Sequence, residues 1–275
     1  PETLAAIGVV RSPRVLGWVG HLVRYIYNRC TLVLGQSRGF LDSITRYCDD
    51  KSKIRYFPSW SEDVFTQTGV QPAAEVRARP EVFSVLFAGN LGDAQDLPAV
   101  LAAAELLKLV PGVRWLIVGV GRKSDWLQAE VIRRGLEHQV LILGRHSVER
   151  MPSFYAHADA LLVSLKKDPA FSLTIPGKLQ SYLMSGAPVL SMLDGEGAEI
   201  VRASQAGLAC AAGDSAGLAA AVMTMAAMSR EERAAMGSRG REFARREFGR
   251  DMLMNRLEQM LKESIEMHKE QSAPA

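Results

Sequence analysis

Three lysines and the start of a helix fall within a short stretch of the sequence. Lys166 and Lys167 follow an apolar run, and Lys178 stands in the first turn of a helical stretch that Pro176 and Gly177 open. The N-terminus of a helix offers free backbone N–H groups and a positive dipole end, which bind phosphate. The stretch therefore predicts an anion site, with a solvated loop of surface lysines as the alternative.

A glycine loop is the second segment suited to ligand chemistry. Gly89 and Gly92 follow the apolar run 82–88, and Asn90 and Gln95 add polar side chains to it. Glycine lets the backbone approach a ligand closely because it has no Cβ atom. This loop therefore predicts a second set of phosphate contacts.

Six apolar, β-rich runs alternate with helical stretches from residue 82 onward. This alternation predicts an α/β fold with a Rossmann-like, parallel six-stranded sheet and helices on both faces. Such sheets bind ligands outside the carboxyl ends of their strands, where the lysines and glycines described above lie. The predicted strands are 82–88, 114–118, 140–143, 160–164, 188–192 and 208–211, and the predicted helices are 97–110, 124–135, 148–157, 177–185, 197–204 and 215–228.

The first 80 residues predict too few strands for a stable sheet of their own. We expect helices at 13–29 and 38–47 and strands at 31–36 and 53–57. Because the chain also begins with Pro1, we expect it to be cut from a longer protein. The predicted division is a C-terminal remnant of an acceptor-side Rossmann-like domain at 1–60, a linker at 61–81, a ligand-binding domain at 82–228, and C-terminal helices at 229–275 that pack back toward the N-terminal part.

Composition argues against several classes of protein. The 275 residues include 33 Lys and Arg and 30 Asp and Glu, a net charge of +3, which is too even for a nucleic-acid binder. The three cysteines are far apart and the five histidines lack metal-ligand spacing, so we expect no metal, no disulfide framework and a reducing, cytoplasmic compartment. No apolar run approaches the roughly 18 residues of a spanning helix. Gly119 and Gly121 lack the third glycine of a dinucleotide fingerprint.

In order and spacing, these segments resemble the group 1 (family 4) retaining glycosyltransferases. The likeness is strongest to the bacterial branch that includes the fucosamine and colanic-acid fucosyl transferases, in which Pro-Ser-Lys or Pro-Gly-Lys opens the helix. The segments that carry the resemblance are LGQSRGF (34–40), IRYFPSW (54–60), VLFAGNLGDAQDL (85–97), WLIVGVG (115–121), VLILGRH (140–146), ADALLVSL (158–165) and IPGKLQSYLMSGAPVL (175–190).

The resemblance implies a GT-B architecture, in which two Rossmann-like domains face one cleft and the C-terminal domain binds a nucleotide-sugar donor. Charge develops on the leaving pyrophosphate, and helix dipoles, N–H groups and cations stabilise it. No cofactor and no obligatory metal are implied. The branch implies a donor linked to UDP and a lipid-linked or glycan acceptor in bacterial surface polysaccharide or lipopolysaccharide synthesis. We expect the isolated chain to bind donor without transferring sugar.

The family's charged positions carry over only in part. Asn90 and Gln95 stand where most members have Arg and Lys, so the resemblance assigns the missing charge to Lys178 first and Lys166 second. Leu173 and Ser181 stand at the two positions of the family's glutamate pair. Ser181 offers the ribose a weaker hydrogen bond than a carboxylate does. The resemblance implies this donor-binding set: Gly89, Asn90, Gly92, Gln95, Gly144, Arg145, Ser172, Thr174, Pro176, Gly177, Ser181 and Glu199.

Some of these assignments have plain structural alternatives. Arg145 is placed to stack on the base, yet an arginine there is equally typical of a solvated surface. Glu199 matches a family glutamate, and it also suits the first turn of any helix. The altered positions favour, as an alternative function, a nucleotide-sugar-binding module without catalysis. A nucleotide-sugar 2-epimerase needs carboxylates and a histidine in the cleft, which 171–181 lacks.

The helix at 13–29 is amphipathic and basic. Its apolar stripe is typical of a helix packed on a sheet. Its arginines also suit peripheral contact with the cytoplasmic face of an anionic inner membrane. Both interpretations stay open on the sequence alone.

Overall fold

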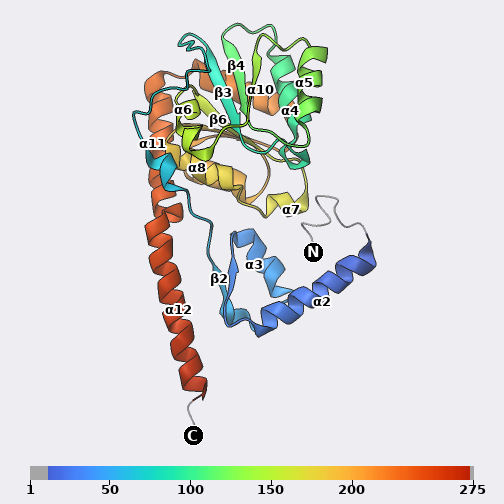
Figure 1. Ribbon diagram of the computed structural model, residues 1–275, viewed down its shortest axis with the longest axis vertical. Helices are drawn as coiled ribbons and strands as arrows, with labels where there is room; N and C mark the ends of the chain where they lie inside the picture. Colours follow the sequence, from blue (N-terminus) through green and yellow to red (C-terminus); the bar gives the residue numbers. More distant parts are fainter. Residues whose placement is uncertain (1–11, 273–275) are drawn as a thin grey trace.

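The computed structural model describes residues 12–272 and contains a six-stranded parallel sheet (Figure 1). The predicted α/β class is confirmed, and each predicted strand matches an observed one within two residues at either end. Residues 1–11 and 273–275, which belong to the predicted first and last segments, lie outside the described residues. The strands are β3 (Phe83–Ala88), β4 (Val113–Val118), β5 (Val140–Gly144), β6 (Ala160–Ser164), β7 (Val189–Met192) and β8 (Gly207–Cys210).

The strand order is β5-β4-β3-β6-β7-β8, so the direction of winding reverses between β3 and β6. A reversal of this kind opens a crevice at the carboxyl ends of the two central strands. The register shows the opening directly. All six residues of β3 pair with β4, whereas only Val85 and Leu86 pair with β6. Phe87 and Ala88 therefore end β3 without a strand partner on that side.

Strands β3, β4, β6 and β7 are buried along their whole length, because helices cover both faces of the sheet. Alternate side chains of each strand point to opposite faces and join two separate apolar cores. One core is closed by α4 (Leu97–Leu106), α5 (Ser124–Arg133) and α10 (Ser215–Ala227), and the other by α6 (Met151–Tyr155), α8 (Gly177–Ser185), α9 (Glu196–Ala203) and α11 (Arg230–Phe248).

Two segments differ from the helices predicted for them. The predicted helix 148–157 is a 3₁₀ turn at Val148–Arg150 followed by the short α6, which has Pro152 in its first turn. The predicted loop after β6 contains α7 (Pro169–Ser172). The Asp168 carboxylate caps α7 by accepting a hydrogen bond from the Ala170 N–H at 2.8 Å. This cap is local and was not recognised in the sequence.

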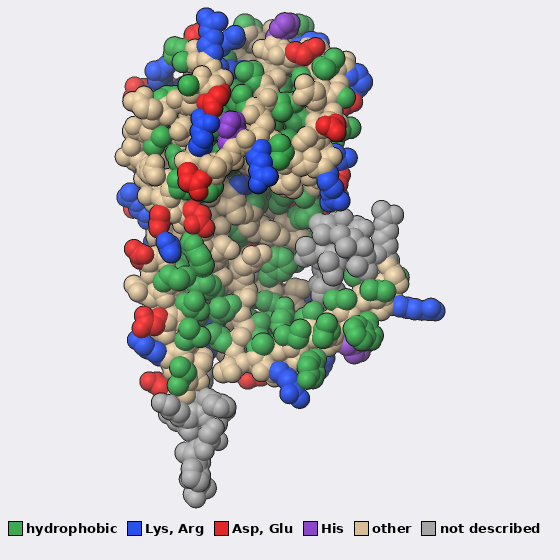
Figure 2. Space-filling view, viewed as in Figure 1, with side chains coloured by type: hydrophobic (Ala, Val, Ile, Leu, Met, Phe, Trp, Pro, Cys, Tyr) green, Lys and Arg blue, Asp and Glu red, His purple; other side chains and the backbone are tan. Residues whose placement is uncertain are grey.

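The N-terminal part holds α2 (Pro13–Arg29), β1 (Val33–Gly35), α3 (Arg38–Thr45) and β2 (Ile54–Tyr56), close to the predicted elements. Its two strands pair in parallel, and its small core is formed by Val33, Ile44 and Cys48. No residue of α2 is buried, and hydrophobic side chains lie along its surface (Figure 2).

α11 and α12 (Arg250–Ser272) form a long column that reaches from the sheet toward the N-terminal part (Figure 1). The guanidinium of Arg256 on α12 lies 6.0 Å from the centre of the Tyr56 ring. The Ser61 N–H, just after β2, donates to the Phe248 carbonyl at 3.1 Å. Within the described residues, no helix has the length and apolar character needed to cross a bilayer.

Candidate functional site

Two glycine loops meet at the carboxyl ends of β3 and β4. Gly89 and Gly119 adopt φ values of +142° and +139°, which side chains other than hydrogen disfavour. A Cβ atom at Gly119 would lie 1.9 Å from the Gly89 carbonyl oxygen. The Leu91 N–H donates to the Val120 carbonyl at 3.0 Å and holds the loops together. The backbone can pack this closely only because glycine stands at both places.

Tyr182 fixes α8 over the end of β3. Its hydroxyl accepts from the Ala88 N–H at 2.9 Å and donates to the Ala88 carbonyl at 3.0 Å. Those are the groups that β6 leaves without a ladder partner, so the tyrosine satisfies a buried strand end. The side chain is fully buried, and desolvation raises its pKa above the ordinary value, which keeps the hydroxyl protonated. This anchor holds the first turn of α8 beside the Gly89 loop.

Lys178, in that first turn, points its ammonium group at the glycine loop. A Cβ atom at Gly89 would lie 3.1 Å from Lys178 Nζ, and Nζ lies 3.8 Å from the centre of the Phe87 ring. The Nζ atom is buried and has no hydrogen-bond partner among the described residues. Burial therefore lowers the pKa of Lys178 to about 7. An unpaired ammonium in this position is ready to receive an anion.

The N-terminus of α8 is open in the same way. Pro176 is the N-cap residue and provides no side-chain hydrogen bond, and the first turn contains no acidic residue. Gly177 is exposed, so its side of the turn is accessible. Most helices satisfy their first N–H groups with a cap. The open turn adds its dipole to the charge of Lys178.

A pocket of about 280 Å³ lies against the glycine loops. It brings together three of the predicted residues, Gly89, Asn90 and Arg145. Gly144 does not line the pocket, but its carbonyl accepts from the Gly119 N–H at 2.7 Å. Arg145 is exposed, which leaves its guanidinium available to a ligand. The pocket is lined by Gly89, Asn90, Val118, Gly119, Val120, Arg145, His146 and Met151.

Other predicted residues are engaged within the protein. Gln95 accepts from the Gly92 N–H through Oε1 at 3.0 Å and so closes its own turn. The Ser172 and Thr174 hydroxyls donate to carbonyls of α7, at 2.7 Å and 3.0 Å. Ser181 turns its hydroxyl back to the Gly177 carbonyl at 3.5 Å. These contacts place the four side chains in local structure and not in the pocket.

Lys166 and Glu199 lie outside the pocket as well. The hydrogen bond from Lys123 is the main reason that the pKa of Asp93 is lowered, and the charge of Lys166 adds to it. Burial raises the pKa of Asp96, and the charge of Lys166 offsets part of that rise. Glu199 lines a different pocket, between α9, α11 and the N-terminal part, together with Arg38 and Tyr56. The two lysines therefore differ in their surroundings: Lys166 lies near two carboxylates, whereas the Lys178 ammonium has no hydrogen-bond partner among the described residues.

Glu196 is a residue that the sequence did not single out. Its carboxylate accepts from the Arg38 N–H at 2.8 Å and from the Gly39 N–H at 2.7 Å, at the N-terminus of α3. The Ser37 hydroxyl, beside them, donates to the Leu173 carbonyl at 2.5 Å. The same carboxylate helps burial to raise the pKa of Tyr56 to about 12. The only signal in the sequence is an acidic residue three positions before Glu199, at the start of a helix.

A larger pocket, of about 480 Å³, lies at the opposite edge of the sheet, away from these residues. Size alone would favour it as the ligand site, but the glycines, the open helix and the unpaired lysine all lie at the carboxyl edge. Among the described side chains, no three His, Cys, Asp or Glu residues lie close enough together to hold a metal ion.

These features define an α/β protein with the GT-B type of fold. A family model described as "Glycosyl transferases group 1" matches residues 82–227, more than half of the chain, so the chain belongs to that family. Glycogen synthase from Mycobacterium tuberculosis is 26% identical over 249 residues, which are 84% of this chain and 57% of the relative. The chain thus spans little more than half the length of the curated relatives that it matches.

Solved structures share the fold at lower identity. Sucrose-phosphate synthase from Thermosynechococcus elongatus has a TM-score of 0.75 at 18% identity, over 95% of this chain and 66% of that protein. Anabaena Alr3699/HepE in complex with UDP has a TM-score of 0.74 at 16% identity, over 92% and 70%. The chain therefore has the GT-B type of α/β fold.

Proposed function

We propose that the carboxyl edge of the sheet binds the diphosphate of a nucleotide-sugar donor for a retaining glycosyltransferase. The observation that carries the proposal is the buried Lys178 ammonium without a partner, aimed at Gly89 beside the open N-terminus of α8. A desolvated cation is costly to maintain unless a ligand compensates it. A diphosphate supplies the missing negative charge.

Lys178, the α8 dipole and the backbone N–H groups act together on the leaving group. As the bond between the sugar and the diphosphate breaks, negative charge gathers on the diphosphate oxygens. Groups that are already oriented and desolvated stabilise this charge more than water does. Lys178 must be protonated for this, and the anion itself raises the lysine pKa from about 7 when it binds.

For the donor we propose a UDP-linked sugar. Two proteins of similar fold were crystallised with UDP, Anabaena Alr3699/HepE and, with GlcNAc in addition, the pneumococcal O-GlcNAc transferase GtfA. In this chain the exposed Arg145 guanidinium at the rim of the pocket suits stacking on the base. The fucosamine and colanic-acid branch, and with it an N-acetylated deoxyhexose, is part of the same proposal.

The acceptor we propose is a lipid-linked or other glycan of bacterial surface polysaccharide or lipopolysaccharide synthesis, met at the inner face of the inner membrane. The support is α2, which carries Arg14, Arg24 and Arg29 but no acidic residue and leaves Trp18 74% exposed. A basic amphipathic helix binds anionic bilayers. Sedimentation with phosphatidylglycerol vesicles should pull down the chain and should fail with Trp18→Ser. Equal sedimentation of both would refute the membrane contact.

Calorimetric titration with UDP-glucose tests the donor site. Lys178→Met keeps the apolar stem and removes only the charge, so affinity should fall about 30-fold at pH 6, the worth of a strong charge-assisted contact. Lys167→Met is the matched control, because Lys167 is exposed in the loop after β6 and should bind as the unchanged chain does. Equal affinity in the Lys178→Met and Lys167→Met variants would overturn the diphosphate role.

A non-catalytic nucleotide-sugar-binding module is the second candidate, and one observation favours it. Leu173 and Ser181 occupy the positions of the family's glutamate pair, and Ser181 is bonded back to the Gly177 carbonyl. A version of the protein that includes the rest of an acceptor-side domain should release nucleoside diphosphate from donor when given acceptor glycan. Binding without release would favour the module. For the 275-residue chain alone we expect binding and no transfer.

A further inference from the structure

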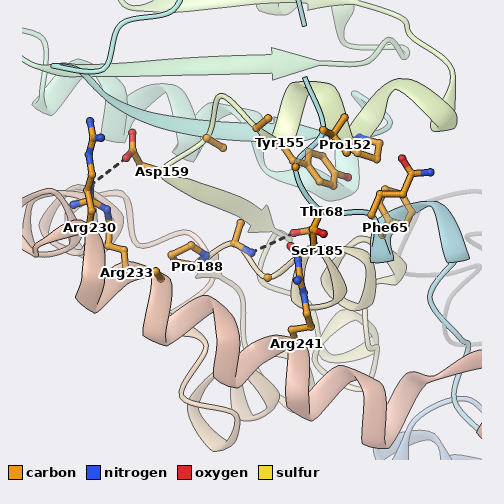
Figure 3. Close-up of a pocket in the computed structure, with 18 residues that line it drawn as sticks. Phe65, Thr68, Pro152, Tyr155, Asp159, Ser185, Pro188, Arg230, Arg233 and Arg241 are labelled. Carbon is orange, nitrogen blue, oxygen red and sulfur yellow. Dashed lines mark hydrogen bonds and ion pairs between the residues drawn. The ribbon is translucent and has the colours of Figure 1, made fainter. Parts of the chain in front are cut away.

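The pocket of about 480 Å³ lies at the amino ends of β6 and β7, at the opposite edge of the sheet from Lys178 (Figure 3). Residues 67–70 of the linker form one wall, and Pro152 and Tyr155 of α6 form another. The turn that follows α8 and one face of α11 complete it. The pocket therefore lies between the sheet and the two segments, linker and α11, that connect it to the N-terminal part.

The lining of this pocket is cationic. Arg230, Arg233 and Arg241 all come from α11, and Asp159 is the only acidic residue among the lining residues (Figure 3). The Asp159 carboxylate is already engaged, because it pairs with Arg233 at 3.2 Å and accepts from the Ser84 N–H at 2.9 Å. The described lining thus has three guanidinium groups and one carboxylate, an excess of two positive charges.

The other two guanidinium groups bond only to backbone carbonyls. Arg241 donates through Nε to the Met184 carbonyl at 3.0 Å and also to the Ser185 carbonyl. Arg230 donates to the Pro80 carbonyl at 3.1 Å. In the described part of the chain, no carboxylate forms an ion pair with either arginine. Carbonyl partners orient a guanidinium group but do not neutralise its formal charge as a carboxylate does.

The sequence of α11 makes room between these arginines. Positions 230, 233, 234, 237 and 241 share one face of the helix. Ala234 and Gly237 stand between the charged residues, and Ala234 is exposed to the pocket. A Cβ atom at Gly237 would lie 1.9 Å from the Gly186 carbonyl oxygen, so α11 packs tightly there and stays in place. The pocket has space at this face of α11 because a small residue, Ala234, stands between the arginines.

We propose that this pocket binds a small phosphate ester, at a site separate from the donor site. The lining has an excess of positive charge, and the planar fork of arginine matches phosphate oxygens. Arg230 keeps most of its N–H donors for such a ligand, because only its Nη2 is engaged in the described structure, whereas Nε and Nη2 of Arg241 are taken by carbonyls. The Phe65 and Tyr155 rings, stacked at 5.7 Å between centroids, give the pocket an apolar wall for the ester group. A ligand here touches both the linker and α11. The site does not depend on the proposed donor function.

Titration with glucose 1-phosphate tests the site in the Lys178→Met background, in which the donor edge no longer offers a free ammonium. Arg230→Gln should weaken binding about tenfold, the worth of one charge-assisted contact. Arg239→Gln is the matched control, since Arg239 also lies on α11 and also donates to one backbone carbonyl, that of Gln205, but does not line the pocket. It should bind as the background chain does. Equal losses in both variants, or no binding to the background chain, would overturn the proposal.

Ala234→Leu provides an independent test that keeps every charge. The larger side chain fills the floor of the pocket on an exposed helix position, where leucine is well tolerated in a helix. Glucose 1-phosphate should then bind at least about tenfold more weakly because of the lost space. In the background chain, the ligand should also slow hydrogen exchange of the amides at 67–70. Unchanged exchange together with full binding by Ala234→Leu would place the ligand elsewhere and refute the site.

Discussion

The two edges of the six-stranded sheet hold their cations in opposite ways. At the carboxyl edge, the Lys178 ammonium is buried with no partner in the described structure. At the amino edge, the Arg241 guanidinium is tied to the carbonyls that end α8. Lys178 belongs to α8 and Arg241 contacts the end of the same helix, yet only Arg241 forms hydrogen bonds with its backbone. Arg241 therefore supports the fold while it also lines a pocket, whereas the Lys178 ammonium keeps all of its N–H donors for a ligand.

Stability should separate the two cations most clearly. Arg241→Met leaves the last carbonyls of α8 without donors, so the free energy of unfolding should fall by about 2–4 kcal/mol. Lys178→Met removes a buried charge that has the Phe87 ring beside it but no hydrogen-bond partner in the described structure, and the free energy should rise by about 1–3 kcal/mol. Urea denaturation of both variants, with the unchanged chain beside them, measures the two effects.

The sign of the Lys178 effect also depends on pH. The folded pKa of about 7 lies below the ordinary 10.5, so the cost of burying the ammonium is complete below pH 7 and disappears as pH rises from about 7 to 10. The gain from Lys178→Met should therefore be larger at pH 6 than at pH 9. A loss of stability in Lys178→Met at both pH values would mean that the ammonium supports the fold, and the contrast between the edges would fail.

The affinity for the donor should also depend on pH through Lys178. A diphosphate raises the pKa of Lys178, so affinity is highest where the free lysine is already protonated, below about pH 7, and it falls as pH rises above that value. We expect UDP-glucose to bind about tenfold more weakly at pH 9 than at pH 6, a modest part of what a fully coupled proton would give. The Lys178→Met chain should give a flat profile. Parallel profiles for both chains would assign the pH dependence to another group.

The sequence predicted the fold well because burial and helix period act locally. The strands are mostly apolar runs, and all residues of β3, β4, β6 and β7 are in fact buried, including Arg114 and three serines. The short α7 was missed because it depends on one cap by Asp168, which ordinary helix periodicity does not register. The break in the predicted helix 148–157 coincides with Pro152, which stands in the first turn of α6.

The candidate site was predictable only in part. Lys178, Gly89 and the open start of α8 were found because residue type and position in the strand–loop–helix pattern are enough to place them. The engagement of Gln95, Ser172 and Thr174 in their own turns depends on side-chain rotamers that the sequence does not state. Glu196 was missed because its partners, the N–H groups of Arg38 and Gly39, are more than 150 residues away.

A smaller effect tests the charge balance at the amino edge. Asp159→Asn removes the only carboxylate from the described lining of the pocket at the amino edge and breaks the ion pair of Asp159 with Arg233. The free energy of unfolding should fall by about 1 kcal/mol, because the pair is partly exposed and the Ser84 N–H keeps an oxygen acceptor. Glucose 1-phosphate should bind about threefold more tightly through the added net positive charge. Weaker binding in this variant would show that Asp159 itself contacts the ligand or orients Arg233 for it.

The smallest effect concerns the N-termini of two helices, one without a bound carboxylate and one with it. The N-terminus of α8 is open, whereas that of α3 is filled by the Glu196 carboxylate. Glu196→Gln keeps an oxygen acceptor and removes the charge, so the free energy of unfolding should fall by only about 0.5 kcal/mol, the worth of a dipole interaction at a partly exposed helix end. UDP-glucose affinity should not change, because a filled helix start has no free N–H groups for the diphosphate. If affinity falls as it does in Lys178→Met, the two helix starts form one site across the cleft, and the division between an open and a filled terminus would have to be abandoned.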